Sequence, residues 1–193
     1  QLEKENLSIG QRILAQELRL TVRGKDKIGI IGPNGAGKST LLAKLQQLLS
    51  PKREISLSFM PQDYHKKLQL EISPVAYLSQ TGQKEELQKI QSHLASLNFS
   101  YPEMHHQIRS LSGGQQGKLL LLDLVLRKPN FLLLDEPTRN FSPTSQPEIR
   151  KLFASYPGGL ITVSHDRRFL KEVCTSIYRL TENGLEVVAL QDL

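Results

Sequence analysis

The chain has 193 residues, of which 38% are hydrophobic and 23% are charged, a composition that fits one sizeable folded domain. No apolar run approaches the roughly 20 residues of a membrane-spanning helix, so a membrane role would require a partner chain. The formal net charge is +6, but the basic residues are scattered in pairs. Such pairs are typical of a solvated surface, and contact with RNA phosphates stays open.

The cysteine content and the first residues indicate the compartment. Cys174 is the single cysteine, which excludes an internal disulfide and suits a reducing cytoplasm. We interpret it as a small buried hydrophobe rather than a nucleophile. The chain starts with Gln1 and shows no signal-peptide pattern, so we expect a cytoplasmic piece of a longer protein.

The first predicted elements lead into a glycine-rich loop. Residues 16–22 alternate apolar and polar side chains, which predicts a half-buried strand. Residues 27–31 form an apolar run typical of a buried parallel strand, and leucines at helical spacing predict a helix over 39–49. Between them lies 32–40, GPNGAGKST, which fits G-x-x-x-x-G-K-[ST], the phosphate-binding loop.

The chemistry of this loop explains its residue types. Glycine lets the backbone curl so that successive N–H groups point at phosphate oxygens, with a helix N-terminus behind them. Lys38 would place its charge on the β- and γ-phosphates, and the Ser39 hydroxyl could ligate Mg²⁺. A chance match in a glycine-bearing turn is the alternative, which the flanking strand and helix disfavour. The candidate nucleotide-binding residues here are Gly32, Pro33, Asn34, Gly35, Ala36, Gly37, Lys38, Ser39 and Thr40.

A helical insertion is expected next. The alternating pattern over 55–59 predicts an edge strand that leads to Gln62. Residues 63–109 then carry helix signals, the clearest being an apolar repeat over 84–98.

The segment 111–115, LSGGQ, opens a further predicted helix. Ser112 is placed as the N-cap, and Gln115 three residues later completes a capping box. Gly113 and Gly114 leave the first N–H groups of the helix bare, as an anion site requires. A capped helix with a flexible entry is the simpler alternative. The apolar residues over 119–126 predict that this helix is largely buried.

A second buried strand ends in two carboxylates. Residues 131–134 read Phe-Leu-Leu-Leu, and Asp135 and Glu136 follow directly. Adjacent carboxylates at the end of a buried strand need a cation nearby. In phosphate-loop proteins the first such acid holds Mg²⁺, and we assign the second to the attacking water. The alternative is an exposed acidic turn, which is disfavoured because four apolar residues come directly before the two carboxylates.

The remaining sequence predicts alternating helices and strands. Apolar spacing over 149–153 indicates a helix, and residues 160–163 predict a short strand that delivers His165. His165 is either a satisfied histidine at a strand end or a contact for the γ-phosphate. A helix over 169–173 follows, and Asn183-Gly184 predicts a hairpin between two strands.

These motifs, in this order, resemble the ATP-binding cassette (ABC) ATPase domain over nearly the full chain. The matches are the Walker A loop at 32–40, the Q-loop at Gln62, the signature at 111–115, Walker B with the catalytic glutamate at 131–136, and the switch histidine at His165. The resemblance implies an α/β P-loop NTPase fold with a RecA-like parallel sheet and an N-terminal antiparallel β-subdomain. It implies one domain over residues 1–193, with a small α-helical lobe at 63–125.

The same resemblance implies Mg²⁺-dependent ATP hydrolysis. Gln62, Glu136 and His165 would be catalytic, and Ser39, Asp135 and Gln62 would organise Mg²⁺. The residues Ser112, Gly113, Gly114 and Gln115 would complete the ATP site of a second cassette, either a tandem half or another copy of the chain.

Within that family, residues 163–170, VSHDRRFL, resemble the ABC-F branch. Its members carry two cassettes in one chain and act on ribosomes, in translation control or antibiotic protection. We therefore expect the C-terminal half of such a protein, with the ribosome or its RNA as a partner. The alternatives are the ATP-binding subunit of a membrane transporter and a nucleotide-sensing module with little turnover.

Two single residues and one four-residue segment depart from the family pattern. Ile9 stands where the family has an aromatic residue for adenine stacking, which predicts weaker stacking. Residues 139–142 read Arg-Asn-Phe-Ser where N-H-L-D is usual, which predicts altered coupling to the opposite site. Gln115 stands where ABC-F signatures often have glutamate.

Overall fold

The computed structural model describes residues 2–62, 68–139 and 141–193. Within them the chain forms two units, one of residues 2–62, 129–139 and 150–193 and the other of residues 68–128 and 141–149. Asp63, where the predicted lobe begins, and Asn140 lie outside the described residues. None of the helices in the described ranges combines the length and apolar character that crossing a membrane requires.

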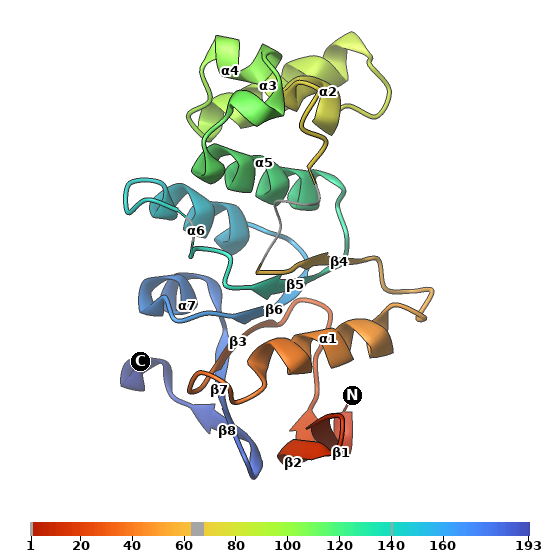
Figure 1. The fold of residues 1–193 in the computed structure, drawn as a ribbon, viewed down its shortest axis with the longest axis vertical. Coiled ribbons are helices and arrows are strands. Elements are labelled where there is room, and N and C mark those ends of the chain that lie inside the picture. The colour runs from red at the N-terminus through yellow and green to blue at the C-terminus, as the bar shows by residue number, and fades with distance from the viewer. Residues whose placement is uncertain (1, 63–67, 140) are drawn as a thin grey trace. The chain divides into compact units, whose positions relative to one another are not determined.

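The first unit is built on a six-stranded sheet with the order β4-β5-β6-β3-β7-β8 (Figure 1). From β4 to β7 in that order the strands pair in parallel, and β8 is antiparallel to β7. The strands are β3 (Lys27–Ile31), β4 (Leu57–Met60), β5 (Phe131–Asp135), β6 (Gly159–Val163), β7 (Ser176–Thr181) and β8 (Gly184–Val188). Every residue of β5 and β6 is buried, as expected for strands inside a parallel sheet.

Helices cover both faces of β3. Ile28 and Ile30 join a core cluster that includes leucines of α1 (Lys38–Leu49). Gly29 lies between them and therefore faces the other way, where a Cβ atom would come within 2.6 Å of Leu170 Cδ2 on α7 (Arg167–Val173). The remaining helical segments of this unit are the C-terminal part of α6 (Gln146–Ala154) and the short η3 (Leu190–Asp192).

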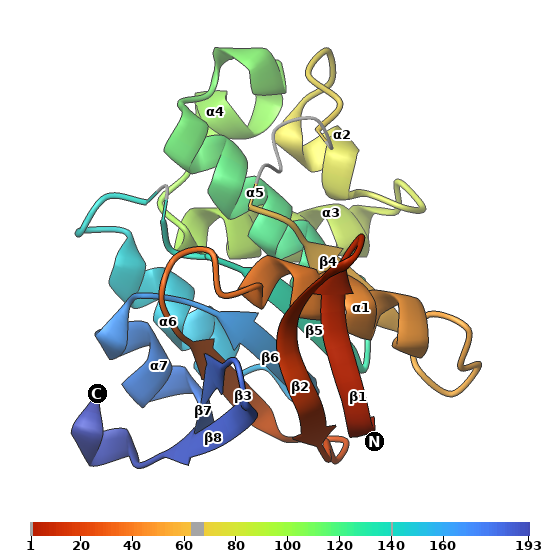
Figure 2. The same cartoon turned by 60° about the horizontal axis from the view of Figure 1, so that its bottom comes forward.

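The N-terminal strands form a separate antiparallel hairpin, which lies beside α1 (Figure 2). β1 (Leu2–Ile9) pairs with β2 (Arg12–Leu20), so the strand expected over 16–22 begins earlier and ends sooner. The early start is explained by a set of register shifts, with left-handed backbone at Lys4 and Glu17. Each shift adds a residue to one strand and resets the alternation of buried side chains, so the sequence period is broken.

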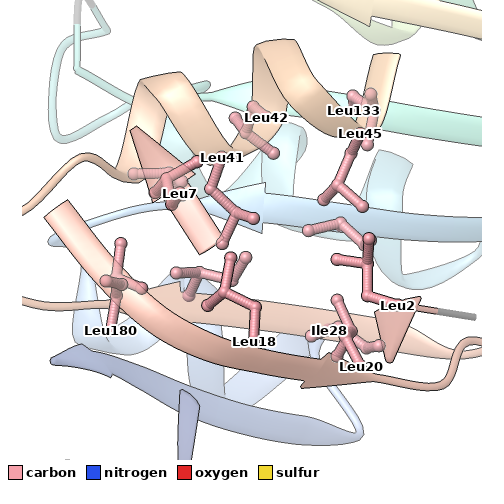
Figure 3. Close-up of a cluster of buried hydrophobic side chains, with 14 of the residues drawn as sticks. Leu2, Leu7, Leu18, Leu20, Ile28, Leu41, Leu42, Leu45, Leu133 and Leu180 are labelled. Atoms are coloured by element: carbon pink, nitrogen blue, oxygen red, sulfur yellow. The ribbon is translucent and has the colours of Figure 1, made fainter. Parts of the chain in front are cut away.

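A single core cluster joins the hairpin, α1 and the central sheet (Figure 3). The close-up shows leucines of α1 gathered with leucines of both hairpin strands and with β-branched and leucine side chains of the sheet. Helix α1 contributes Leu41, Leu42 and Leu45, which repeat at the spacing that predicted this helix. The hydrophobic face of the hairpin is therefore buried against the helix that begins at the phosphate loop.

The second unit is helical, and its residues 68–128 run from yellow to green in Figure 1. Its elements are α2 (Pro74–Leu78), α3 (Lys84–Ser96), α4 (Tyr101–His105), η2 (Ile108–Ser110) and α5 (Gly113–Leu126). Helix α5 is largely buried, as its apolar sequence predicts, and it buries two charged side chains as well. Lys118 donates to Glu148 Oε2 and to the Leu97 carbonyl, each at 3.0 Å, and Asp123 pairs with Arg127 at 2.9 Å. Both buried charges are thus compensated.

Glu86 in the first turn of α3 gathers the preceding loop around its carboxylate. The backbone N–H groups of Gln80, Thr81 and Gly82 donate to it. The hydroxyls of Ser79 and Thr81 donate to it as well. These hydrogen bonds, led by the one from the Gln80 backbone, lower the pKa of Glu86 to about 2. Because the folded-state pKa lies below the unfolded value of about 4.3, the ionised carboxylate stabilises the fold above that pH.

Replacing Glu86 with glutamine should therefore destabilise the chain at neutral pH, because an amide oxygen cannot accept all five hydrogen bonds. The difference from wild type should shrink as the pH falls through about 4.3 towards 2. Urea unfolding between neutral and acid pH measures this. Glu85→Gln removes the same charge without these contacts and serves as the control. An equal loss in both variants, or a difference that is independent of pH, would contradict the assignment.

Candidate nucleotide-binding site

Four parallel strands of the first unit end at one edge of the sheet. They end at Ile31, Met60, Asp135 and Val163 in β3, β4, β5 and β6. The carboxyl edge of a parallel sheet is where α/β proteins bind their ligands. The segments that leave this edge contain the phosphate loop, Gln62, Glu136 and His165. The structure thus brings the predicted site residues of this unit to one edge, and Gln62 is exposed there.

The phosphate loop runs from β3 into α1 through left-handed backbone. Gly37 is the N-cap of α1 with φ of 95°, and Gly35 has φ of 82°, both in the region that favours glycine. A Cβ atom on Gly37 would lie 2.7 Å from Leu14 Cδ1, so a side chain there would have to push the Leu14 side chain aside. Apart from the two neighbouring residues in the chain, no described residue has an atom within 4 Å of a Cβ built on Gly35, so the loop is open on that side.

Lys38 lies within the loop and is only 8% exposed. Its Nζ donates to the carbonyl oxygens of Gly32 and Pro33, at 2.9 Å each. Burial lowers the pKa of Lys38, and the charges of Glu136 and Asp135 oppose that shift. Neutral carbonyls hold an ammonium group less strongly than an anion does, so these two contacts leave the charge of Lys38 available to an anion.

The acid pair lies at the end of β5. Asp135 is 5% exposed; burial raises its pKa, while a hydrogen bond from the Ser39 hydroxyl and the charge of Lys38 oppose the shift. Glu136 has left-handed backbone, with φ of 51°, which is uncommon for a residue with a side chain. Such strain is often found where a side chain must be aimed at a site. The charge of Lys38 acts on both Asp135 and Glu136, so it is the nearby cation that the sequence pattern requires.

Glu136 and His165 meet across β5 and β6. The His165 backbone N–H donates to Glu136 Oε2 at 3.3 Å. The ring nitrogen Nε2 of His165 lies 3.5 Å from Glu136 Oε1. Burial raises the pKa of Glu136, and the hydrogen bond and charge of His165 oppose this. The His165 ring is half exposed, so it can reach a ligand at this edge as well as the carboxylate.

The donor atoms of this edge fit a hard divalent cation that is shared with a ligand. Asp135 and Ser39 offer a carboxylate and a hydroxyl that already contact each other. Among the described residues, no group of three or more His, Cys, Asp or Glu could hold a metal alone. Mg²⁺ commonly takes one or two carboxylates and completes its shell with phosphate oxygens and water, which matches this arrangement.

A hollow of about 230 Å³ lies beside the phosphate loop. Its lining comprises Arg12, Ile13 and Leu14, residues 33–36 of the loop, and residues 180–182. Ile9, where the family pattern places an aromatic residue, ends β1 at the hairpin turn and is 58% exposed. No motif in the sequence marks Arg12 or Ile13, because the fold of the hairpin alone brings them next to the loop.

Replacing Ile9 with tyrosine should strengthen ATP binding by roughly tenfold, since stacking of a base on an aromatic ring contributes about 1–3 kcal/mol. Isothermal titration calorimetry with Mg·ATP measures the gain. Inorganic triphosphate, which has no base, is the control ligand and should bind both proteins alike. A gain that is equal for both ligands would rule out stacking as its cause.

The signature residues lie in the second unit, at the start of α5. Ser112 is the N-cap, and its hydroxyl accepts from the Gln115 backbone N–H at 3.3 Å. Gln115 Oε1 in turn accepts from the Ser112 backbone N–H at 3.0 Å, so the predicted capping box is present. Gly113 and Gly114 form the first turn of the helix.

The segment after the acid pair, which departs from the family pattern in sequence, forms a local turn. Arg139 is exposed and Phe141 is 6% exposed, whereas Asn140 lies outside the described residues. Ser142 makes hydroxyl contacts with Thr144 at 2.9 Å and Ser145 at 3.1 Å. The serine thus closes a local turn, with its hydroxyl engaged inside its own segment.

Comparison with known proteins gives the family. The sequence profile described as "ABC transporter" matches residues 15–139. The chain is 30% identical over 192 residues to "Probable ATP-binding protein YheS" of Escherichia coli (strain K12), covering 96% of this chain and 30% of YheS. It is 32% identical over 198 residues to "Uncharacterized ABC transporter ATP-binding protein YfmR" of Bacillus subtilis (strain 168), covering 95% of this chain and 31% of YfmR. The chain thus spans about a third of the length of these relatives.

A solved structure shares the fold. It is the dimeric post-hydrolysis state of the ATP-binding cassette MJ0796 bound to ADP and Pi, with a TM-score of 0.76 and 17% identity over 97% of this chain and 96% of that one. The predicted α/β P-loop fold, with its parallel sheet and N-terminal antiparallel strands, is confirmed. Since the matching profile spans the phosphate loop, the signature and the acid pair, the chain belongs to the ABC transporter family.

Proposed function

We propose that this chain binds and hydrolyses ATP, as one cassette of an ABC-F-type protein that acts on ribosome-associated targets. The observation that carries the proposal is the convergence of Lys38, Asp135, Glu136 and His165 at one edge of the sheet. The basic, buried Lys38 and the two acids are the groups that phosphoryl transfer to water uses.

Each residue at this edge has a role in the proposed reaction. The N–H groups of the loop and the Lys38 ammonium hold the phosphates, and Ser39, Asp135 and Gln62 would hold Mg²⁺. When bound, that ion neutralises charge on the phosphate oxygens. Glu136 orients the attacking water and accepts its proton, and His165 contacts the γ-phosphate. Burial of Glu136 supports this role, since its raised pKa makes it a better proton acceptor than an exposed carboxylate.

The proposed active form contains a second cassette, from a tandem half or from another copy of the chain. In it, Ser112, Gly113, Gly114 and Gln115 of one cassette would complete the ATP site of the other. We also propose that both units of the chain work as a single nucleotide-binding domain, with the helical lobe at 63–125. The dimeric state of the solved neighbours supports the pairing.

The ribosomal target and a cytoplasmic location rest on similarity. The likeness to YheS and YfmR runs over nearly the whole chain, and the VSHDRRFL segment supports the same branch. The net charge of +6 is compatible with a polyanionic partner.

Two measurements test this function. Steady-state phosphate release should require Mg²⁺, and its rate per molecule should rise with protein concentration if two cassettes form the site. Nucleotide binding without release would favour the sensing module. In co-sedimentation, the ATP-bound chain should pellet with ribosomes and detach as salt rises. Selective capture by membranes that carry a transporter partner would instead favour the transporter subunit.

A further inference from the structure

Two helix starts of the second unit carry the same kind of cap. At α4, the Ser100 backbone N–H and hydroxyl donate to Glu103 Oε2, at 2.7 and 2.8 Å. At α5, the Ser112 backbone N–H and hydroxyl donate to Gln115 Oε1, at 3.0 and 3.1 Å. Both are complete capping boxes, in which the third residue of the helix reaches back to the N-cap.

One hydrogen bond joins the two caps, from Gln115 Nε2 to Glu103 Oε1. Glu103 thus uses Oε2 for the cap of α4 and Oε1 for Gln115. Gln115 uses Oε1 for the cap of α5 and Nε2 for Glu103. The amide of Gln115 has a single orientation here, because its oxygen is held by Ser112 and its NH₂ group must face the carboxylate. The result is a continuous chain of contacts from Ser100 through Glu103 and Gln115 to Ser112.

Glu103 is charged in this arrangement. Hydrogen bonds from the Ser100 backbone, the Ser100 hydroxyl and Gln115 lower its pKa, and the charge of Lys118 acts in the same direction. An ionised carboxylate only accepts hydrogen bonds, so position 115 must supply a donor. Glutamine does this, whereas glutamate would set two carboxylates against each other. The need for a donor explains why position 115 is glutamine in this chain, whereas the signature of the ABC-F branch often has glutamate there.

We propose that Glu103 is a positioning residue for the signature, which fixes the Gln115 amide and thereby the backbone and hydroxyl of Ser112. The functional part rests on the proposed function, in which Ser112 and Gly114 complete the ATP site of a second cassette. Glu103 then fixes the position of the first turn of α5 relative to that nucleotide, and Glu103 itself does not contact the nucleotide.

An exchange of the two side chains tests the inference. Gln115→Glu opposes two carboxylates and should displace the start of α5. Glu103→Gln together with Gln115→Glu restores a donor and an acceptor with the polarity reversed, so every contact can form again. Ser100→Ala is the matched control, because it removes one hydroxyl from the α4 cap and leaves the Glu103–Gln115 contact in place.

The first readout is ATP-dependent dimerisation, measured by sedimentation in the Glu136→Gln background. Gln115→Glu should weaken it by roughly tenfold or more, the effect of losing a hydrogen bond to a charged group. The exchange variant should recover to within about twofold, and Ser100→Ala should stay close to the parent. Mg·ATP affinity of the monomer should be unchanged throughout, which separates positioning from the cassette's own nucleotide site. An exchange variant no better than Gln115→Glu would overturn the inference.

The second readout does not depend on nucleotide. In ¹H–¹⁵N NMR spectra, the amide signals of Gly113 and Gly114 should move in Gln115→Glu and return in the exchange variant. If the parent fails to dimerise with ATP but these signals behave as stated, the proposed function fails and the positioning role stands. If the signals do not move in Gln115→Glu, Glu103 does not position the signature.

Discussion

Replacing Glu136 with glutamine is expected to reduce steady-state ATP hydrolysis by roughly 10²–10⁴-fold, the usual contribution of a positioned general base. The amide keeps the size of the side chain and can still accept the His165 N–H through its oxygen, so the edge of the sheet should stay intact. It cannot take a proton from water. Mg·ATP binding should therefore remain close to wild type, and the ATP-bound dimer should accumulate.

Phosphate release and calorimetry on the same preparations measure the two effects. Glu54→Gln is the matched control, since it makes the same chemical change at an exposed residue that precedes β4 and lies away from the carboxyl edge. Turnover of Glu136→Gln within a few fold of the control would remove Glu136 from its proposed role. Because the pKa of Glu136 is raised, its carboxylate is protonated at a higher pH than an ordinary glutamate. The hydrolysis rate of wild type should therefore begin to fall at that higher pH as the solution is made more acidic.

Replacing Lys38 with methionine should abolish nucleotide binding without harming the fold. Burial lowers the pKa of this lysine, so the folded state holds its charge at a cost, and the attraction of Glu136 and Asp135 offsets part of that cost. Methionine of similar length removes both the cost and the attraction, so the nucleotide-free variant should still fold and unfold at a temperature close to that of wild type. Saturating Mg·ATP should stabilise wild type by about 2.7 kcal/mol at a hundredfold excess over Kd, and the variant hardly at all.

Thermal unfolding with and without Mg·ATP measures this difference. Lys44→Met on the same helix is the control, because Lys44 pairs with Glu5 at 2.6 Å and donates to the Asn6 carbonyl. Its loss should lower the unfolding temperature but preserve the shift with nucleotide. A Lys38→Met protein that is still stabilised by Mg·ATP would contradict the proposed grip on the phosphates.

The sequence was most informative where a single strand or helix contains the whole signal. The apolar runs that became β3, β5 and β6 are buried on both faces, so composition alone marks them. Helix α1 and the α5 cap were also predicted, because the spacing of their residues is local. The burial of Cys174 agrees with its interpretation as a small hydrophobe, and burial raises its pKa to about 12.

Features made by contacts between segments could not be predicted in this way. The bulges at Lys4 and Glu17 depend on the pairing of two strands, so periodicity misplaced β2. The contacts of Lys118 with Glu148 and of Glu103 with Gln115 join positions 30 and 12 residues apart. Nothing in either local pattern marks them, since an acidic residue in a first turn and a lysine in a helix are both ordinary.

The place of β3 within the sheet has a consequence for biosynthesis. Its two neighbours, β6 and β7, span residues 159–163 and 176–181, so they are translated long after β3 itself. Until they emerge from the polypeptide exit tunnel, both edges of β3 lack their native partners, and the proposed phosphate-binding loop that follows β3 is not held in place by the sheet. The proposed nucleotide site should therefore form only after residues 159–181 have emerged, so we expect ATP binding to follow the synthesis of β7.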